Sequence, residues 1–190
     1  EEGTRFRNAF VVTSLCSPAR ATILTGKYTH MHGIDDNGTP FPPDKPTIAT
    51  ALQNAGYHTG YFGKWHMNGQ KDRPGFDEVA SFIGQGRYYN CPLMINGNLT
   101  KTKGWVDEVV TDHAIDFINR QKQDRPFFLF LGFKSPHGPR TDNSVPEEYR
   151  TLYKNARSYP VPNTSVLPSY AEYKDSVDKM GGGLSSPLKE

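Results

Sequence analysis

A cysteine near the start of the chain lies in a setting that can make its sulfur reactive. Cys16 is followed closely by Pro18 and Arg20, in a segment that can begin a helix. Proline suits the first helical positions because its missing N–H would have no partner there. The free N–H groups and positive dipole end of a helix start bind anions. The pattern therefore indicates a thiol beside an oxyanion cradle, although an isolated cysteine is more often buried and inert.

Two further groups of polar side chains follow predicted strands. Lys64 and His66 come at the end of a strand predicted over 57–63, and strand alternation would place both on one face. His137, between two prolines, follows a strand predicted over 127–133. Ligands of open α/β sheets bind outside the carboxyl ends of the strands. Taken alone, these motifs also fit a solvated lysine and histidines that pack in the core or lie in a turn. Their expected convergence with Cys16 at one edge of the sheet favours an anion site.

Helices and strands alternate along the sequence. Apolar periodicity and turn residues predict helices over 19–28, 47–55 and 105–121, and strands over 6–12, 57–63 and 127–133. Between them, residues 67–104 are predicted to be loops with one short hairpin near 88–98, and the last strand is expected to be fully buried. This order predicts an α/β fold with a mostly parallel sheet and helices on both faces.

Composition excludes several classes of protein. The 190 residues suffice for one core, which we place at 1–154, with a Pro/Gly-rich tail over 155–190 that is extended or weakly ordered. The net charge of +2 gives no overall field for nucleic acid, and no apolar run suits a membrane span. The two cysteines, Cys16 and Cys91, are too few for a disulfide framework, so both are expected to be free.

The run at 16–27 closely resembles the signature of the type I sulfatases, C-x-P-x-R followed by L-T-G and a basic residue. A G-K-x-H motif at 63–66 and a P-H-x-P turn at 136–139 follow in the order found in that family. The similarity covers residues 5–163. It implies an alkaline-phosphatase-like fold and hydrolysis of sulfate esters.

The resemblance also implies a reaction. A formylglycine-generating enzyme would oxidise Cys16 to formylglycine, whose hydrate attacks the sulfur and releases the alcohol, after which its second hydroxyl expels sulfate. Arg20 would hold the hydrate, while Lys64, His66 and His137 would bind sulfate oxygens. The substrate implied is a sulfated carbohydrate or aryl sulfate. A phosphoester or phosphonate hydrolase of the same superfamily, or a non-catalytic binder of sulfated glycans, is the alternative.

Substrate contacts are harder to assign. Asp36 and Asn37 could touch a sugar or form a plain turn. The aromatic side chains of Tyr88, Tyr89 and Trp105 could stack on a sugar or pack in the core.

The resemblance further implies a calcium ion, with the formylglycine from Cys16 among its ligands, and a periplasmic or secreted location. The paired aspartates that the family carries before its cysteine, and the Asp-Asn-Gly that it carries after its histidine, have no counterpart in this sequence. We therefore expect an incomplete catalytic domain that, taken alone, is weakly active or inactive.

Overall fold

The computed structural model describes residues 3, 4, 6, 8–67, 73–122, 124–139, 144–152 and 155. The chain divides into two compact units, residues 1–150 and 151–190, and every element below belongs to the first. Except for residue 155, the tail predicted over 155–190 lies outside the described residues, and the predicted domain boundary at 154 stays a prediction.

Five strands form one mixed sheet in the order β4-β3-β2-β1-β5. They are β1 (His58–Lys64), β2 (Glu78–Phe82), β3 (Leu93–Ile95), β4 (Asn98–Thr100) and β5 (Phe127–Gly132). The central strand β1 pairs in parallel with both β2 and β5, as an α/β fold requires. The strands β3 and β4 add an antiparallel hairpin at one edge, where Asn96 and Gly97 both take the positive φ of a tight hairpin turn.

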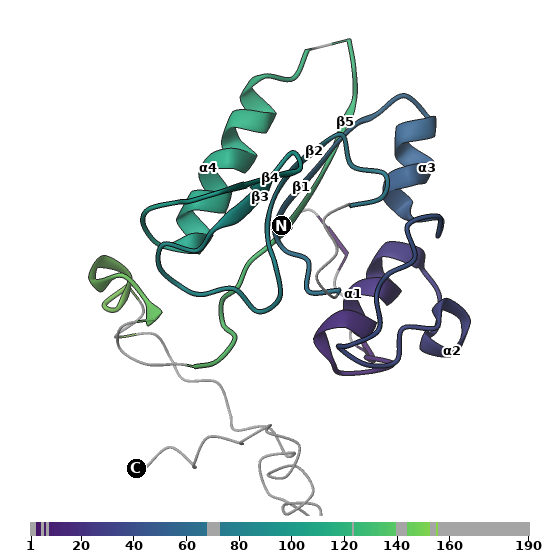
Figure 1. Ribbon diagram of the computed structural model, residues 1–190, viewed down its shortest axis with the longest axis horizontal. Helices are drawn as coiled ribbons and strands as arrows, with labels where there is room; N and C mark the ends of the chain where they lie inside the picture. Colours follow the sequence, from purple (N-terminus) through teal and green to yellow (C-terminus); the bar gives the residue numbers. More distant parts are fainter. Residues whose placement is uncertain are drawn as a thin grey trace, which may run out of the picture. The chain divides into compact units, whose positions relative to one another are not determined.

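Helices cover both faces of this sheet, as the sequence predicts (Figure 1). On one face lies α4 (Val106–Asn119); on the other lie α1 (Cys16–Thr25), α2 (Thr29–His32) and α3 (Ile48–Asn54). A short 3-10 helix, η2 (Glu147–Tyr149), follows the last strand. None of the helices in the described part of the chain has the length and apolarity that a membrane crossing needs.

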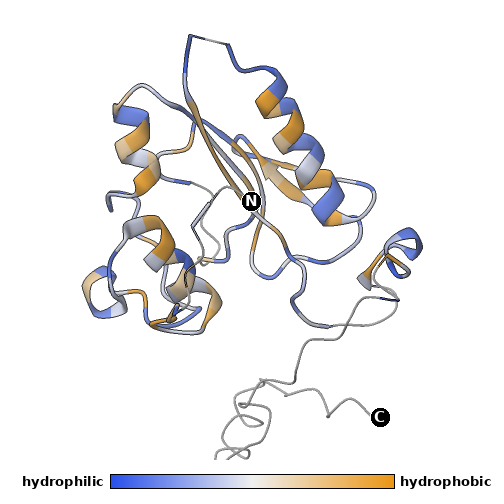
Figure 2. Cartoon of the chain, turned by 180° about the vertical axis from the view of Figure 1, so that it is seen from behind, coloured by the Kyte–Doolittle hydropathy of each residue, from blue (hydrophilic) through white to orange (hydrophobic). Residues whose placement is uncertain are grey.

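Each face of the sheet has its own core. Alternation along β1 sends Phe62 toward α4, where it packs with Val110 and Phe117, and sends Tyr61 to the opposite face. There Tyr61 joins the side chain of Trp65 and the residues of α1. Figure 2 shows hydrophobic patches alternating with hydrophilic ones along α4, the pattern of a helix with one buried side. The two cores fix β1 between its layers.

Three predicted elements differ from the structure. The strand predicted over 6–12 is wrong: the described residues there pair with no strand, and Phe6, Phe10 and Val11 are exposed. In the stretch 67–104, predicted to be loops with one short hairpin near 88–98, the hairpin is present as β3 and β4, but the strand β2 was not predicted. The expected full burial of 127–133 is also wrong, because β5 is the edge of the described sheet and Phe127 is 41% exposed.

A carboxylate of α4 holds the segment that follows β5. Asp107, in the first turn of α4, accepts the backbone N–H of Lys134 at 2.8 Å and that of Ser135 at 3.0 Å, one with each oxygen. The Asp107 side chain is buried, so removing its carboxylate would take the acceptor away from both N–H groups. Asp107 thereby fixes the chain just before His137.

Replacing this carboxylate is expected to loosen the segment. We predict that Asp107→Asn lowers the free energy of unfolding by about 2 kcal/mol, because an amide presents an N–H where a backbone N–H needs an acceptor. The control is Asp112→Asn, at an exposed residue of α4, which should alter the free energy of unfolding by less than about 0.5 kcal/mol. Urea unfolding measures both. Equal effects at the two positions would contradict the role of Asp107.

Candidate active site

Three chain segments meet at the edge of the sheet where β1 and β5 end. Cys16 is the first residue of α1, Lys64 is the last of β1, and the segment 133–137 follows β5 directly. They line one pocket of about 490 Å³. Its polar lining residues are Cys16, Arg20, Lys64, Lys134, Ser135 and His137. The structure thus brings four of the predicted catalytic residues into one pocket.

The sulfur of Cys16 faces a buried ammonium group. Cys16 is half-buried and free, and the Nζ of Lys64 lies 3.5 Å from its Sγ. Lys64 is only 2% exposed; burial lowers the pKa of its ammonium, and the attraction of the Cys16 sulfur opposes that shift. Cys91 is also free, as predicted, but it lies in the core beneath α4. Cys16 is therefore the thiol in the pocket.

The start of α1 is tied to two other segments. The residue before the helix, Leu15, provides no side-chain cap. Instead, the Oδ1 of Asn37 accepts the backbone N–H of Ser17 at 3.0 Å, and the Ser17 hydroxyl donates to the carbonyl of His66. These bonds hold Cys16 next to the end of β1 and place Asn37 beside it.

Asp36 has a different role in the structure. Its carboxylate accepts the backbone N–H groups of Gly38 and Thr39 and the Thr39 hydroxyl, and these bonds lower its pKa. The carboxylate thus closes its own exposed turn, which is the plain-turn alternative of the sequence analysis. Contact of Asp36 or Asn37 with a substrate stays a prediction.

Arg20 is anchored to the end of β1. Its Nη1 donates to the Lys64 carbonyl at 2.6 Å and reaches the Tyr61 hydroxyl at 3.4 Å. This approach needs Gly132, since a Cβ there would lie 2.9 Å from the same nitrogen. The guanidinium has further N–H groups, so a fixed positive charge remains available on the pocket wall.

His66 lies two residues after the end of β1, and the described residues that line the pocket of Cys16 do not include it. The strand ends at Lys64, and His66 has a φ of 54°, in the left-handed region that non-glycine residues rarely adopt. The prediction that alternation aligns the two side chains is therefore wrong. Its Nδ1 is buried without a hydrogen-bond partner among the described residues. Burial, and then the charges of Lys64, Arg20, His137 and Lys134, lower the pKa of His66 to about 4. The ring is neutral near pH 7.

His137 lies in a turn that fixes its ring. Its backbone N–H donates to the Lys134 carbonyl at 3.0 Å, and the hydroxyl of the buried Tyr88 donates to the His137 carbonyl. The Nδ1 lies 2.8 Å from the Gly138 carbonyl, which can only accept, so Nδ1 carries the proton. The other ring nitrogen, Nε2, is then the one available to a ligand.

Two polar residues of the site were not singled out from the sequence. Lys134 is 3% exposed, and its Nζ donates to the Gln85 backbone carbonyl at 3.0 Å and lies 4.8 Å from the centroid of the Tyr88 ring. Gln85 also accepts from Lys64 through its side chain. Lys134 follows a strand end in the same motif as His137, which was a usable signal. The sequence around Gln85 carries no such signal, because Gln85 lies in a stretch predicted to be loops.

The described residues do not form a calcium site. Among them, no three His, Cys, Asp or Glu side chains gather in a way that could hold a metal ion. The groups around Cys16 are ammonium, guanidinium and imidazole, whereas Ca²⁺ prefers several oxygen ligands. These residues suit an anion rather than a cation.

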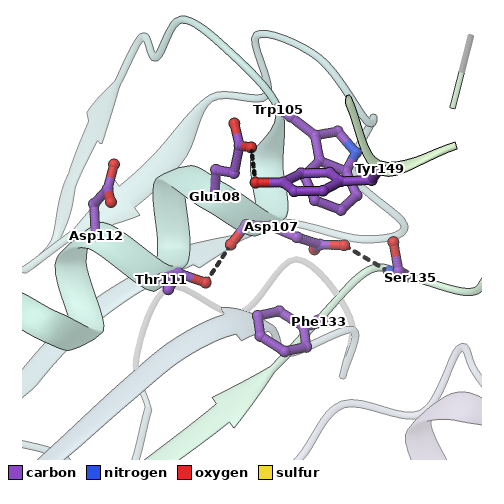
Figure 3. A pocket seen from close by; sticks show the side chains of 8 residues that line it. All are labelled: Trp105, Asp107, Glu108, Thr111, Asp112, Phe133, Ser135 and Tyr149. Carbon is purple, nitrogen blue, oxygen red and sulfur yellow. Dashed lines mark hydrogen bonds between the residues drawn. The ribbon is translucent and has the colours of Figure 1, made fainter. Parts of the chain in front are cut away.

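A second pocket, of about 540 Å³, shares Phe133 and Ser135 with the first (Figure 3). Its walls include Trp105, whose indole N–H donates to the Ser144 carbonyl, and Tyr149, whose ring centroid lies 5.6 Å from that of Trp105. The Tyr149 hydroxyl donates to Glu108, which raises the pKa of Tyr149. Trp105 thus lines this pocket and not that of Cys16. The stacking role considered for Trp105 stays a prediction.

Comparison with known proteins identifies the family. The family model described as Sulfatase matches residues 1–189. The chain is 38% identical over 183 residues to an N-acetylglucosamine-6-O-sulfatase of Bacteroides thetaiotaomicron, which covers 95% of this chain and 30% of that protein. It is 33% identical to an extracellular sulfatase SULF-1 homolog of Drosophila melanogaster, over 88% of this chain and 16% of that protein.

A solved structure shares the fold as well. It is described as a complex with its substrate, D-glucosamine-2-N,6-O-disulfate. The match has a TM-score of 0.69 and 34% sequence identity. It covers 84% of this chain and 32% of the chain in that structure. The chain thus spans about a third or less of the length of these relatives. The match of the family model, together with these relatives, shows that the chain belongs to the sulfatase family.

Proposed function

We propose that this chain carries the nucleophile and the anion-binding groups of a sulfuric ester hydrolase that removes sulfate from a sulfated carbohydrate. One observation carries the proposal: a free, half-buried Cys16 at the first residue of α1, 3.5 Å from the buried ammonium of Lys64. The relatives described above support the same activity.

The residues of the pocket suit a sulfate ester. Its oxygens carry negative charge in the ground state, and charge develops on the leaving oxygen as the S–O bond breaks. The ammonium of Lys64 and the guanidinium of Arg20 are fixed in place before any ligand arrives, so they stabilise this charge without reorganising. His137, with Nε2 available, is placed to bind a sulfate oxygen or to assist the leaving alcohol.

The proposal includes the conversion of Cys16 to formylglycine by a formylglycine-generating enzyme. When formed, this group supplies a hydrated aldehyde whose hydroxyl attacks sulfur. Calcium is also part of the proposal, on the family resemblance alone, since the described residues offer it only the modified Cys16. A periplasmic or secreted location is proposed with it, because relatives of the chain include sulfatases named extracellular.

For the substrate we propose a 6-O-sulfated glucosamine unit. Support comes from the printed names of relatives, which include N-acetylglucosamine-6-O-sulfatase, N-acetylglucosamine-6-sulfatase and a complex with D-glucosamine-2-N,6-O-disulfate. Asn37, whose Oδ1 accepts the Ser17 N–H at the start of α1, and its neighbour Asp36 are the candidates for contacting the sugar.

The direct test removes the nucleophile. We expect the protein, purified at the full length that its gene encodes after coproduction with a formylglycine-generating enzyme, to release sulfate from 6-O-sulfated N-acetylglucosamine. The mass of the residue-16 peptide should fall by about 18 Da when the thiol becomes an aldehyde. Cys16→Ala should then lose activity by at least about 1,000-fold, whereas Cys91→Ala removes only the other thiol and should stay active. Full activity in Cys16→Ala would refute the proposal.

The neutral imidazole of His66 predicts pH-dependent binding. In the free site His66 stays neutral down to a pH near its pKa of about 4, because of its burial and the cations around it. A bound sulfate ion favours the protonated ring, so binding takes up a proton and affinity rises as the pH falls toward the pKa of the free ring. We predict that inorganic sulfate binds about tenfold more tightly at pH 5 than at pH 7.5.

Calorimetric titration at both pH values measures this effect. His66→Gln should reduce the pH dependence, while His30→Gln, at an exposed histidine of α2, serves as the control and should leave it intact. Affinity that falls toward pH 5, or an unchanged pH dependence in His66→Gln, would show that His66 does not face the anion.

A further inference from the structure

A tight turn places Gln85 beside the pocket. It follows β2 and lies between Gly84 and Gly86, each with a φ of 62°. A Cβ on Gly86 would lie 2.5 Å from the ring of Phe82, so a larger residue would push the turn away from the sheet. The glycines therefore fix where the backbone of Gln85 lies.

Gln85 binds both buried lysines of the site. Its Oε1 accepts the Nζ of Lys64 at 2.7 Å, and its backbone carbonyl accepts the Nζ of Lys134 at 3.0 Å. Because an ammonium group can only donate, the side-chain oxygen and not the amide nitrogen must face Lys64. One residue thus orients two ammonium groups that are 2% and 3% exposed.

The acceptor in this arrangement is neutral. Buried lysines are usually paired with a carboxylate, which satisfies the ammonium group and also cancels its charge. In the described part of the chain, neither Lys64 nor Lys134 forms a salt bridge or donates its Nζ to a carboxylate. The oxygens of Gln85 satisfy the two ammonium groups without cancelling their charge, and the carboxylate of Asp107 attracts Lys134 without a hydrogen bond to its Nζ.

We propose that Gln85 is a positioning residue that directs the ammonium groups of Lys64 and Lys134 toward residue 16 while preserving their charge for the anionic group of the substrate. The benefit to a substrate rests on the proposed function, but the effect of Gln85 on the electrostatic potential at residue 16 can be measured separately. Glutamate has the same shape as glutamine and would convert the contact with Lys64 into an ion pair. Methionine has a similar length, carries no charge and provides no strong acceptor.

The first experiment measures the electrostatic potential at Cys16. The full-length protein is made without a formylglycine-generating enzyme, and Cys16 is alkylated with iodoacetate, an anion, or with neutral iodoacetamide. Mass spectrometry of the residue-16 peptide gives the ratio of the two rates. We expect Gln85→Glu to lower this ratio about tenfold, because one added negative charge offsets a nearby ammonium. Gln85→Met retains the cations and should stay within about threefold of the original protein.

The matched control is Asn98→Asp, which makes the same charge change on the exposed edge strand β4. Its ratio should equal that of the unchanged protein. If Gln85→Glu gives the same ratio as Asn98→Asp, the proposed role of Gln85 is wrong.

The second experiment uses the formylglycine-containing enzyme and its sulfate ester. We expect Gln85→Glu to raise KM, because the anion loses a charge partner, and Gln85→Met mainly to lower kcat, because Lys64 loses its orientation. Normal kinetics in both variants would overturn the inference. If the unchanged enzyme cleaves no sulfate ester, the proposed function fails, and the alkylation ratio still decides the role of Gln85.

Discussion

The parallel pairing of β1 with β5 is the constraint on which the site depends. It sets Gly63 opposite Gly132, so that Lys64 and the segment 133–137 emerge at the same edge of the sheet. Gly63 allows this pairing to be close, since a Cβ there would lie 1.9 Å from the Gly132 carbonyl oxygen. The gap left by Gly132 also admits the guanidinium of Arg20 from α1. Gly63 therefore lets β1 pair closely with β5, and Gly132 makes room for Arg20, so motifs far apart in the sequence meet at one edge.

The second property of the site is its unbalanced charge. Lys64 and Lys134 are buried, and the acceptors of their hydrogen bonds are carbonyl oxygens and the Cys16 sulfur. Interactions between charges strengthen as water is excluded, so these cations act on a bound anion more strongly than surface lysines would. Burial and the same cations lower the pKa of His66 to about 4, so its ring is uncharged near pH 7. The ammonium groups of the proposed anion site are thus held in place by hydrogen bonds before a ligand binds.

Local patterns in the sequence predicted the elements that carry one clear signal. Apolar periodicity and turn residues predicted α4 and α3, and in the structure Thr47 and Thr50 form a reciprocal capping pair at the start of α3. The motifs around Cys16, Lys64 and His137 predicted the pocket. Features that depend on distant partners were missed: β2, the exposure of 6–12, and the positive φ of His66. The contacts of Gln85 and Asp107 were hidden for the same reason, since each bonds to a segment far away in the sequence.

The most direct test of this account is a crystal structure of the full-length protein with bound sulfate. The account predicts that the anion lies against residue 16, within hydrogen-bond distance of the Lys64 Nζ and of a ring nitrogen of His66 or His137. Sulfate bound only elsewhere, with Lys64 turned away from residue 16, would contradict it.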